Sequence, residues 1–202
     1  MKKYFIKEGY KHRSKYHHYD DTKEEDYYQD EVYKKAKEIL EEKGYNSVLD
    51  IGCGSGFKLI KYFDKNETVG LELENNLEFL NKKYPNKKWI KSDFESFLKE
   101  DCELIICSDV IEHLVDPDIL FNFINKINYK HVVISTPERD IVRGLNDMGP
   151  PNNPAHVREW NKKEFSNYVS NFIKIEDHLL TPGNKVTKTK GNQIVIGIKN
   201  DN

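Results

Sequence analysis

The stretch Val48-Leu49-Asp50-Ile51-Gly52-Cys53-Gly54-Ser55-Gly56 decides the fold of this chain. Its apolar residues predict a buried strand that ends at Ile51, and the glycines that follow predict a tight turn into a helix. Glycine permits positive φ and lets the backbone come into contact with a ligand. In an open parallel sheet this turn lies at the carboxyl edge of the first strand, where ligands bind. We therefore predict a ligand site that includes Asp50, Gly52, Cys53, Gly54 and Gly56.

The spacing of the glycines favours a cationic ligand over a dinucleotide. A dinucleotide fold uses Gly-x-Gly-x-x-Gly to wrap a pyrophosphate, whereas this turn reads Gly-x-Gly-x-Gly. Asp50 stands two residues before the first glycine, and its negative charge repels phosphate. A strand-to-helix turn without a ligand is the alternative.

Outward from this turn, short β-branched runs alternate with segments of helical periodicity, as is typical of parallel strands joined by crossover helices. The strands are expected at residues 47–51, 68–73, 89–90, 103–107, 131–135, 172–180 and 194–198. Helical patterns run from Val32 to a stop at Gly44, from Asp116 as cap and Pro117 as first residue, and around Phe165. A Pro-Gly-Asn turn makes the last two strands a hairpin.

The order of these elements and the glycine turn resemble the class I methyltransferases from about Val32 to the C-terminus. The resemblance implies an α/β, Rossmann-like fold with a mostly parallel seven-stranded sheet, a C-terminal antiparallel hairpin and helices on both faces. It also implies S-adenosylmethionine as cofactor and S-adenosylhomocysteine as product, with Asp50 and the glycine turn holding the amino-acid part. At 202 residues the chain fits one domain, expected at 32–202, preceded by an arm at 1–31.

Further cofactor contacts are expected at the ends of the next strands. Glu72 follows the turn by about twenty residues, where a carboxylate can accept hydrogen bonds from both ribose hydroxyls, with Leu73 beside it. Glu74 competes for this role, and an ordinary surface acid is the alternative. The resemblance implies that Asp93 binds the adenine amino group and that Phe94 or Trp89 packs against the ring. The alternative is a helix N-cap formed by Asp93 or Ser92. Ser108, Asp109 and Gln29 complete the predicted cofactor set.

The methyl acceptor is expected beside the segment Ser108-Asp109-Val110-Ile111-Glu112-His113-Leu114. Methyl transfer is an in-line displacement, so the protein must align the acceptor and remove a hydroxyl proton. A histidine of near-neutral pKa beside carboxylates suits that task, and we predict catalytic roles for Glu112 and His113. The segment resembles a signature widespread in the family, so shaping of the loop is the alternative.

A second group of polar residues lies in the Pro- and Asn-rich stretch from Gly149 to Trp160, which must be a loop over the sheet edge. We predict that His156 acts as a base and that Arg158, with Arg139, holds an anionic part of the acceptor. The alternative is that Trp160 anchors the next helix while Arg158 pairs locally.

A metal remains an open alternative at this place. Asp109, Glu112, His113 and His156 together offer the oxygen and nitrogen ligands of a transition-metal site. Similar sets occur in the small-RNA 3′-end 2′-O-methyltransferases, but Asp109 replaces their usual Glu and the sequence has no obvious RNA platform. We therefore predict a site without a metal and keep the metal as the alternative.

The composition limits the classes of partner that we expect for this chain. A formal net charge of −2 gives no overall attraction to nucleic acid or anionic membranes. The three cysteines have no Cys-x-x-Cys spacing, and neither a secretory signal nor an apolar run of ~20 residues occurs. We expect a cytoplasmic protein, monomeric or homodimeric, without membrane or nucleic-acid partners.

The resemblance narrows the function further. An Asp-Asp-Thr segment before a Gln-x-x-Val-Tyr helix, and the loop Pro-Asn-x-Pro-x-His-Val-Arg-Glu-Trp, resemble small bacterial methyltransferases that modify surface sugars. This implies O-methylation of a small-molecule hydroxyl on a sugar, sugar phosphate or nucleotide-linked sugar in surface-polysaccharide or capsule biosynthesis. The alternatives are a metal-assisted RNA 2′-O-methyltransferase, a non-catalytic cofactor-binding scaffold, and a dinucleotide oxidoreductase, which the glycine spacing disfavours. The region from Tyr16 to Thr22 is expected to form a lid over the cofactor, or else a surface arm.

Overall fold

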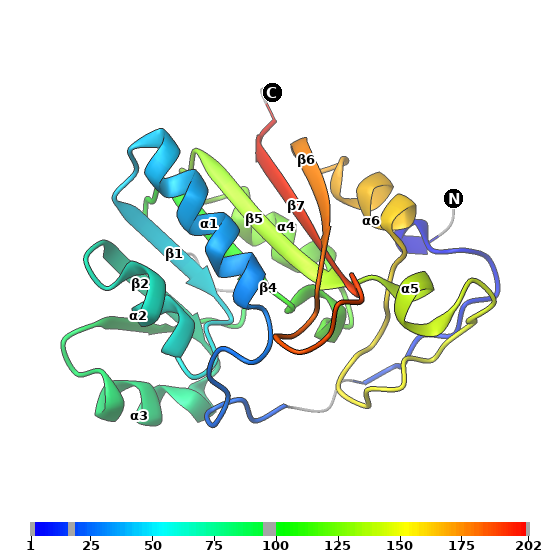
Figure 1. The fold of residues 1–202 in the computed structure, drawn as a ribbon, viewed down its shortest axis with the longest axis horizontal. Helices are drawn as coiled ribbons and strands as arrows, with labels where there is room; N and C mark the ends of the chain where they lie inside the picture. The colour runs from blue at the N-terminus through cyan, green and yellow to red at the C-terminus, as the bar shows by residue number, and fades with distance from the viewer. Residues whose placement is uncertain (1–2, 16–18, 95–99, 201–202) are drawn as a thin grey trace.

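One mixed sheet of seven strands organises the computed structural model, which describes residues 3–15, 19–94 and 100–200 (Figure 1). The strands are β1 (Ser47–Ile51), β2 (Glu67–Glu72), β3 (Lys88–Lys91), β4 (Leu104–Ser108), β5 (His131–Pro137), β6 (Ile173–Thr181) and β7 (Asn192–Lys199). Their order in space is β3-β2-β1-β4-β5-β7-β6. Pairing is parallel from β3 to β5, and β7 pairs antiparallel with both β5 and β6. The predicted fold class is therefore confirmed.

The helices for which the sequence predicts an end begin or end within two residues of it. They are α1 (Asp30–Lys43), α2 (Phe57–Phe63), α3 (Glu74–Lys83), α4 (Asp118–Ile124), α5 (Arg139–Arg143) and α6 (Lys162–Val169), with the short 3-10 helices η1 (Lys3–Phe5) and η2 (Ile111–His113). Gly44 ends α1 in the left-handed conformation, as expected. Helix α4 starts one residue later than predicted: Pro117 is its N-cap, and the Asp118 N–H donates to the Asp116 side chain.

Two apolar layers cover the two faces of the sheet. Because side chains alternate along a strand, Leu104 and Ile106 of β4 pack in the layer of α1 and α2, whereas Ile105 and Cys107 pack in the layer of α4 and α6. Figure 1 shows α1 in front of the sheet and α4 behind it. The helices on both faces fix the strands, so the loops at the strand ends are held on a rigid frame.

The carboxyl ends of β1 and β4 lie side by side at the centre of the sheet, since β2 pairs with the other side of β1. A change in the direction of the crossovers leaves a crevice at such a place, where ligands of open α/β sheets bind. Residues 19–29 run along this edge, in dark blue below α2 in Figure 1. Tyr16, His17 and His18 of the predicted lid lie outside the described residues. The division into an arm at 1–31 and a domain at 32–202 stays a prediction.

None of the helices in the described part of the chain combines the length and the apolar composition needed to cross a membrane.

Candidate active site

The glycine turn after β1 has the conformation that its sequence predicts. Gly52, Gly54 and Gly56 have φ of 71°, 55° and 69°, which residues with a Cβ rarely adopt. The N–H groups of Gly52 and Cys53 donate to the Leu71 carbonyl of β2 at 2.9 and 3.1 Å. The turn is thus fixed to the end of the neighbouring strand, with Cys53 buried beneath it.

Glu72 is part of the same turn. Its Oε2 accepts from the Gly54 N–H at 2.8 Å, and its Oε1 accepts from the Leu73 N–H at 2.7 Å. Burial, followed by the charge of Asp21, raises the pKa of Glu72 to about 7. Each carboxylate oxygen has a second lone pair, so the predicted bonds to ribose hydroxyls remain compatible with these contacts.

Asp50 provides the test of whether a cationic cofactor fits the residues present. It is fully buried, Tyr33 Oη donates to its Oδ2 at 2.8 Å, and its Oδ1 has no hydrogen-bond partner among the described residues. Burial and then the neighbouring carboxylates, Glu72 and Asp21, raise the pKa of Asp50 to about 7 against the pull of Tyr33 and Lys58. A buried acid of this kind needs a partner, and the ammonium and sulfonium groups of S-adenosylmethionine have the required charge.

The remaining predicted cofactor residues lie before α1 and at or after the ends of β3 and β4. Gln29 caps α1 in the left-handed conformation and its Nε2 reaches the Ser108 carbonyl at 3.5 Å. Phe94 packs against Phe123 with ring centroids 5.4 Å apart, while the side chain of Asp93 is exposed at the end of β3. Their roles toward the adenine ring stay predictions.

The predicted four-residue metal set is brought together only in part. Asp109 has a φ of 53°, and Ser135 Oγ donates to its Oδ1 at 2.5 Å. It lies outside the group of Glu112, His113 and His156, whose ligand atoms all lie within 4.8 Å of one another. The carboxylate of Asp109 therefore belongs to the Ser135 side of the crevice.

We call the group of Glu112, His113 and His156 the acceptor triad. Hydrogen bonds to residues outside the triad fix the orientation of both imidazole rings. His113 Nδ1 donates to the Ala155 carbonyl at 2.9 Å, and His156 Nδ1 lies 2.7 Å from Glu159 Oε1. Both contacts place the lone pair of the neutral imidazole on Nε2. His156 Nε2 lies 4.0 Å from Glu112 Oε1, and Asn153 Nδ2 approaches it at 3.0 Å.

Glu112 is the most confined member of the triad. Its side chain is fully buried, Thr136 Oγ1 donates to its Oε2 at 3.0 Å, and its Oε1 is buried without a hydrogen-bond partner among the described residues. Burial first, and Asp109 second, raise the pKa of Glu112 well above its usual range. An oxygen of this kind, close to two imidazoles, is suited to accept a hydrogen bond from a hydroxyl group or to bind a divalent cation.

Arg158 and Arg139 do not point into this site as predicted. Arg158 donates to the carbonyls of Leu114 and Val115 at 2.9 and 2.6 Å, and its guanidinium lies 4.3 Å from the Tyr4 ring. Arg139 is fully buried and pairs with Asp140 and Glu164. Contacts inside the protein engage both guanidinium groups, in agreement with the alternative that Arg158 pairs locally, and their role in acceptor binding stays a prediction. Trp160 is fully buried and stacked on Tyr168, so it anchors the end of this loop before α6, in agreement with the alternative given for this stretch.

The sequence did not single out Lys58 at the second position of α2. It is buried, donates to the Glu25 carbonyl at 3.1 Å, and lies over the Tyr33 ring at 5.5 Å. Its charge contributes to lowering the pKa of Asp50. No sequence signal marks it, because a lysine in a short helix usually faces solvent.

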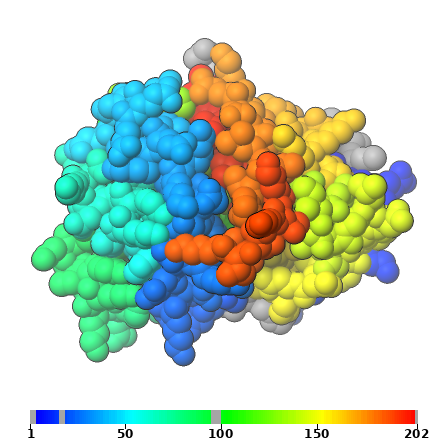
Figure 2. Space-filling view, viewed as in Figure 1, coloured from blue at the N-terminus to red at the C-terminus, as the bar shows by residue number. Residues whose placement is uncertain are grey.

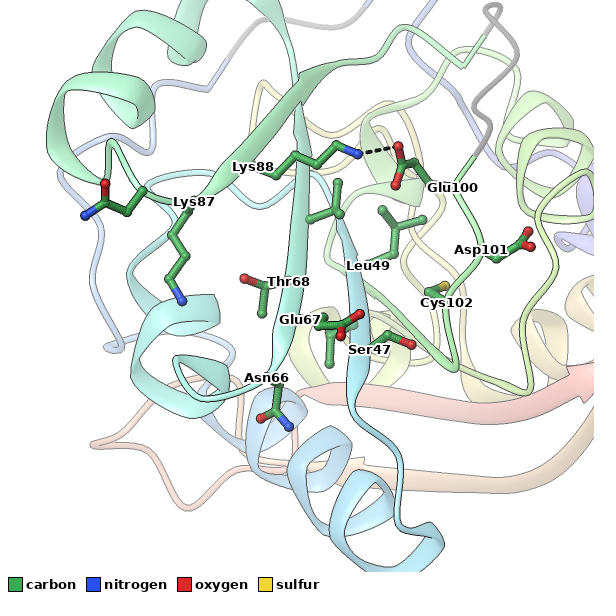
Figure 3. A pocket seen from close by; sticks show the side chains of 13 residues that line it. Ser47, Leu49, Asn66, Glu67, Thr68, Lys87, Lys88, Glu100, Asp101 and Cys102 are labelled. Carbon is green, nitrogen blue, oxygen red and sulfur yellow. Dashed lines mark hydrogen bonds and ion pairs between the residues drawn. The ribbon is translucent and has the colours of Figure 1, made fainter.

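A cavity of about 410 Å³ lies at the opposite, amino-terminal edge of the sheet (Figure 3). Ser47, Thr68 and Lys88 line it from three neighbouring strands, and Lys88 pairs with Glu100 across it. None of the predicted site residues is among the described residues that line this cavity. We therefore assign the chemistry to the carboxyl edge.

The comparisons with known proteins agree with this geometry. Residues 18–172 match the model of a methyltransferase domain family, and the chain belongs to this family. The fold and the glycine turn make it a class I methyltransferase, and the predicted cofactor, S-adenosylmethionine, is confirmed. No curated protein sequence matches the chain significantly.

Solved structures share the fold at low sequence identity. The methyltransferase domain of bacterial CtHen1-C has 19% identity and a TM-score of 0.63, over 84% of this chain and 97% of that one. The small RNA methyltransferase HEN1 has 18% identity and a TM-score of 0.66, over 87% of this chain and 26% of that one. The magnesium protoporphyrin IX methyltransferase ChlM from Synechocystis PCC 6803, with bound SAH, has 14% identity and a TM-score of 0.64, over 84% and 83%. At these identities the likeness concerns the fold alone.

Proposed function

We propose that the chain is an O-methyltransferase that methylates a hydroxyl of a small-molecule sugar, sugar phosphate or nucleotide-linked sugar in bacterial surface-polysaccharide biosynthesis. The acceptor triad carries the proposal. It places one buried carboxylate and two imidazoles at the carboxyl edge of β4, one strand away from the glycine turn. An aliphatic hydroxyl must lose its proton as it attacks, and this arrangement of a carboxylate and two imidazoles is suited to take it.

S-adenosylmethionine supplies a methyl group on a sulfonium that leaves as a neutral thioether. His156 is the base once the acceptor hydroxyl replaces the Asn153 amide at Nε2, because the carboxylate of Glu159 behind Nδ1 stabilises the imidazolium that forms when Nε2 takes the proton. Glu112 Oε1 orients the hydroxyl, and the Ala155 carbonyl holds the His113 ring beside it. Placement of the nucleophile in line with the methyl group is the larger part of catalysis in such a displacement.

A second candidate is metal-assisted 2′-O-methylation of the ribose at an RNA 3′ end. Two observations favour it. Both histidines of the triad are bound through Nδ1 to an oxygen, which is how metal-ligating histidines are oriented, and two similar folds belong to the Hen1 proteins. Glu112, His113 and His156 would hold the cation, which would bind the hydroxyl and lower its pKa.

One screen separates these two candidates. Release of S-adenosylhomocysteine is measured with nucleotide sugars, sugar phosphates and short RNAs as acceptors, each with and without EDTA. We expect turnover with a sugar. Turnover that requires an RNA 3′ end, disappears with EDTA and returns with Mn²⁺ or Mg²⁺ would establish the second candidate instead.

His156→Ala tests the role of the base. We expect kcat to fall by about 10²–10⁴-fold, the contribution of a positioned general base, while cofactor affinity stays within about threefold. Glu176→Gln on β6, an exposed carboxylate outside the site, is the control and should leave both unchanged. Unchanged turnover in His156→Ala would remove this residue from the mechanism.

A further inference from the structure

The carboxylate of Asp21 lies directly against the glycine turn. A Cβ built on Gly54 would lie only 2.0 Å from Asp21 Oδ2 and 2.7 Å from its Cγ. Asn76, at the start of α3, donates through Nδ2 to Asp21 Oδ1 at 3.1 Å. The side chain of Asp21 is therefore positioned at the surface of the turn that faces a ligand, although it lies 33 residues before Gly54 in the sequence.

The segment that carries Asp21 is attached to the helix after the turn. Ser55 Oγ donates to the Glu24 carbonyl, and Lys58 Nζ donates to the Glu25 carbonyl at 3.1 Å. Lys61 forms an ion pair with Asp26. One side chain from the turn and two from α2 thus hold residues 24–26 beside the glycine turn.

The loop between β6 and β7 holds the same segment from the other side. Lys185 Nζ pairs with Asp26 at 2.6 Å, and the Lys185 N–H donates to the Tyr27 carbonyl at 2.9 Å. Tyr28 also forms an isolated antiparallel bridge with Asn184. Figure 2 shows this orange loop against the dark blue segment. Residues 24–28 are therefore held between two elements that are far apart in the sequence.

The carboxylates beside the glycine turn favour the binding of a cationic ligand. Asp21 raises the pKa of both Asp50 and Glu72, so the three carboxylates interact with one another. Lys58 is the buried cation beside them. Its ammonium group donates a hydrogen bond to the Glu25 carbonyl rather than to Asp50. The fully buried Oδ1 of Asp50, which has no hydrogen-bond partner in the part of the chain that the structure describes, is suited to a positively charged ligand.

We propose that Asp21 binds the cationic methionine end of S-adenosylmethionine, and that residues 19–28 close this end of the cofactor site. Asp21 acts together with Asp50: one carboxylate comes from the arm and the other from the end of β1. This role concerns the cofactor alone and holds for any methyl acceptor.

Calorimetry on the full-length protein without acceptor tests this role. We expect Asp21→Asn to weaken S-adenosylmethionine binding by about 10-fold or more, as for loss of a charged hydrogen bond. Glu78→Gln removes an exposed carboxylate from α3, outside the predicted site, and should change the affinity by less than about twofold. Affinity that is unchanged in Asp21→Asn overturns the proposal, and tighter binding overturns it as well, because Asp21 would then be blocking the site.

S-adenosylhomocysteine shows which positive group Asp21 binds, since it has the ammonium but lacks the sulfonium. A loss confined to S-adenosylmethionine supports contact with the sulfonium, and equal losses support contact with the ammonium. Hydrogen exchange tests the closure. We expect slower amide exchange in residues 19–28 when S-adenosylhomocysteine is bound, and exchange that does not change would overturn the closure.

Discussion

Substitution of Asp50 by Asn should make the ligand-free protein more stable at high pH while it impairs cofactor binding. The pKa of Asp50 is about 7 in the folded protein and 3.8 in its reference state. The folded state therefore binds this proton more tightly than the unfolded chain does. Ionisation of Asp50 opposes folding from about pH 4 upward, and the penalty stops growing above about pH 7. From these two values, wild-type stability should fall by about 2–3 kcal/mol relative to Asp50→Asn between about pH 5 and pH 8.

Urea unfolding of both proteins at several pH values between about 5 and 8 measures this difference. The buried amide of Asn does not ionise between these pH values, so any cost of burying it shifts the whole stability curve without changing its slope. Asp64→Asn, at an exposed position after α2, is the control and should differ from wild type by less than about 0.5 kcal/mol throughout. A difference between Asp50→Asn and wild type that does not change with pH would refute the reasoning, because Asp50 would then ionise normally in the folded state.

Two further substitutions test the turn and the loop. Gly54→Ala puts a Cβ against Asp21 at a φ of 55°, and we expect S-adenosylmethionine affinity to fall by about 10-fold or more, measured by calorimetry; Gly183→Ala, where no atom lies within 4 Å of the new Cβ, should bind normally. Arg158→Ala removes the donor to two carbonyls after η2 and should lower the free energy of unfolding by about 1–3 kcal/mol in urea titrations. Lower affinity for the acceptor with unchanged stability would instead restore Arg158 to the substrate site.

The sheet was predictable because its strands are short, apolar and separated by breakers. The run that ends at Ile51 is buried on both faces, and its glycines allow few conformations, so sequence and structure coincide there. The hairpin was recognisable from its Pro-Gly-Asn turn. Helix α5 was not predicted: with five residues, it is too short for an apolar period to emerge.

The orientation of the side chains in the loops could not be predicted from the sequence. Arg158 and His156 are two residues apart and equally polar, but the first contacts backbone carbonyls and the second faces Glu112. Asp109 was grouped with Glu112 because the spacing is short, but its positive φ turns it toward Ser135. Burial of Lys58 depends on residues 24–26, which are remote in sequence. These outcomes depend on tertiary contacts rather than on local pattern.

The contacts between η2 and the loop before α6 explain why the acceptor triad should be rigid. The Val157 N–H donates to the Glu112 carbonyl at 2.7 Å, His113 is bonded to the Ala155 carbonyl, and Arg158 joins the carbonyls that follow. Two segments more than 40 residues apart are thus connected by two kinds of hydrogen bond, from backbone to backbone and from side chain to backbone. Any change that loosens one of them displaces the histidine carried by the other. A loss of turnover in this region therefore identifies a base only if stability is retained, which is why His156→Ala and Arg158→Ala must be compared by both activity and unfolding.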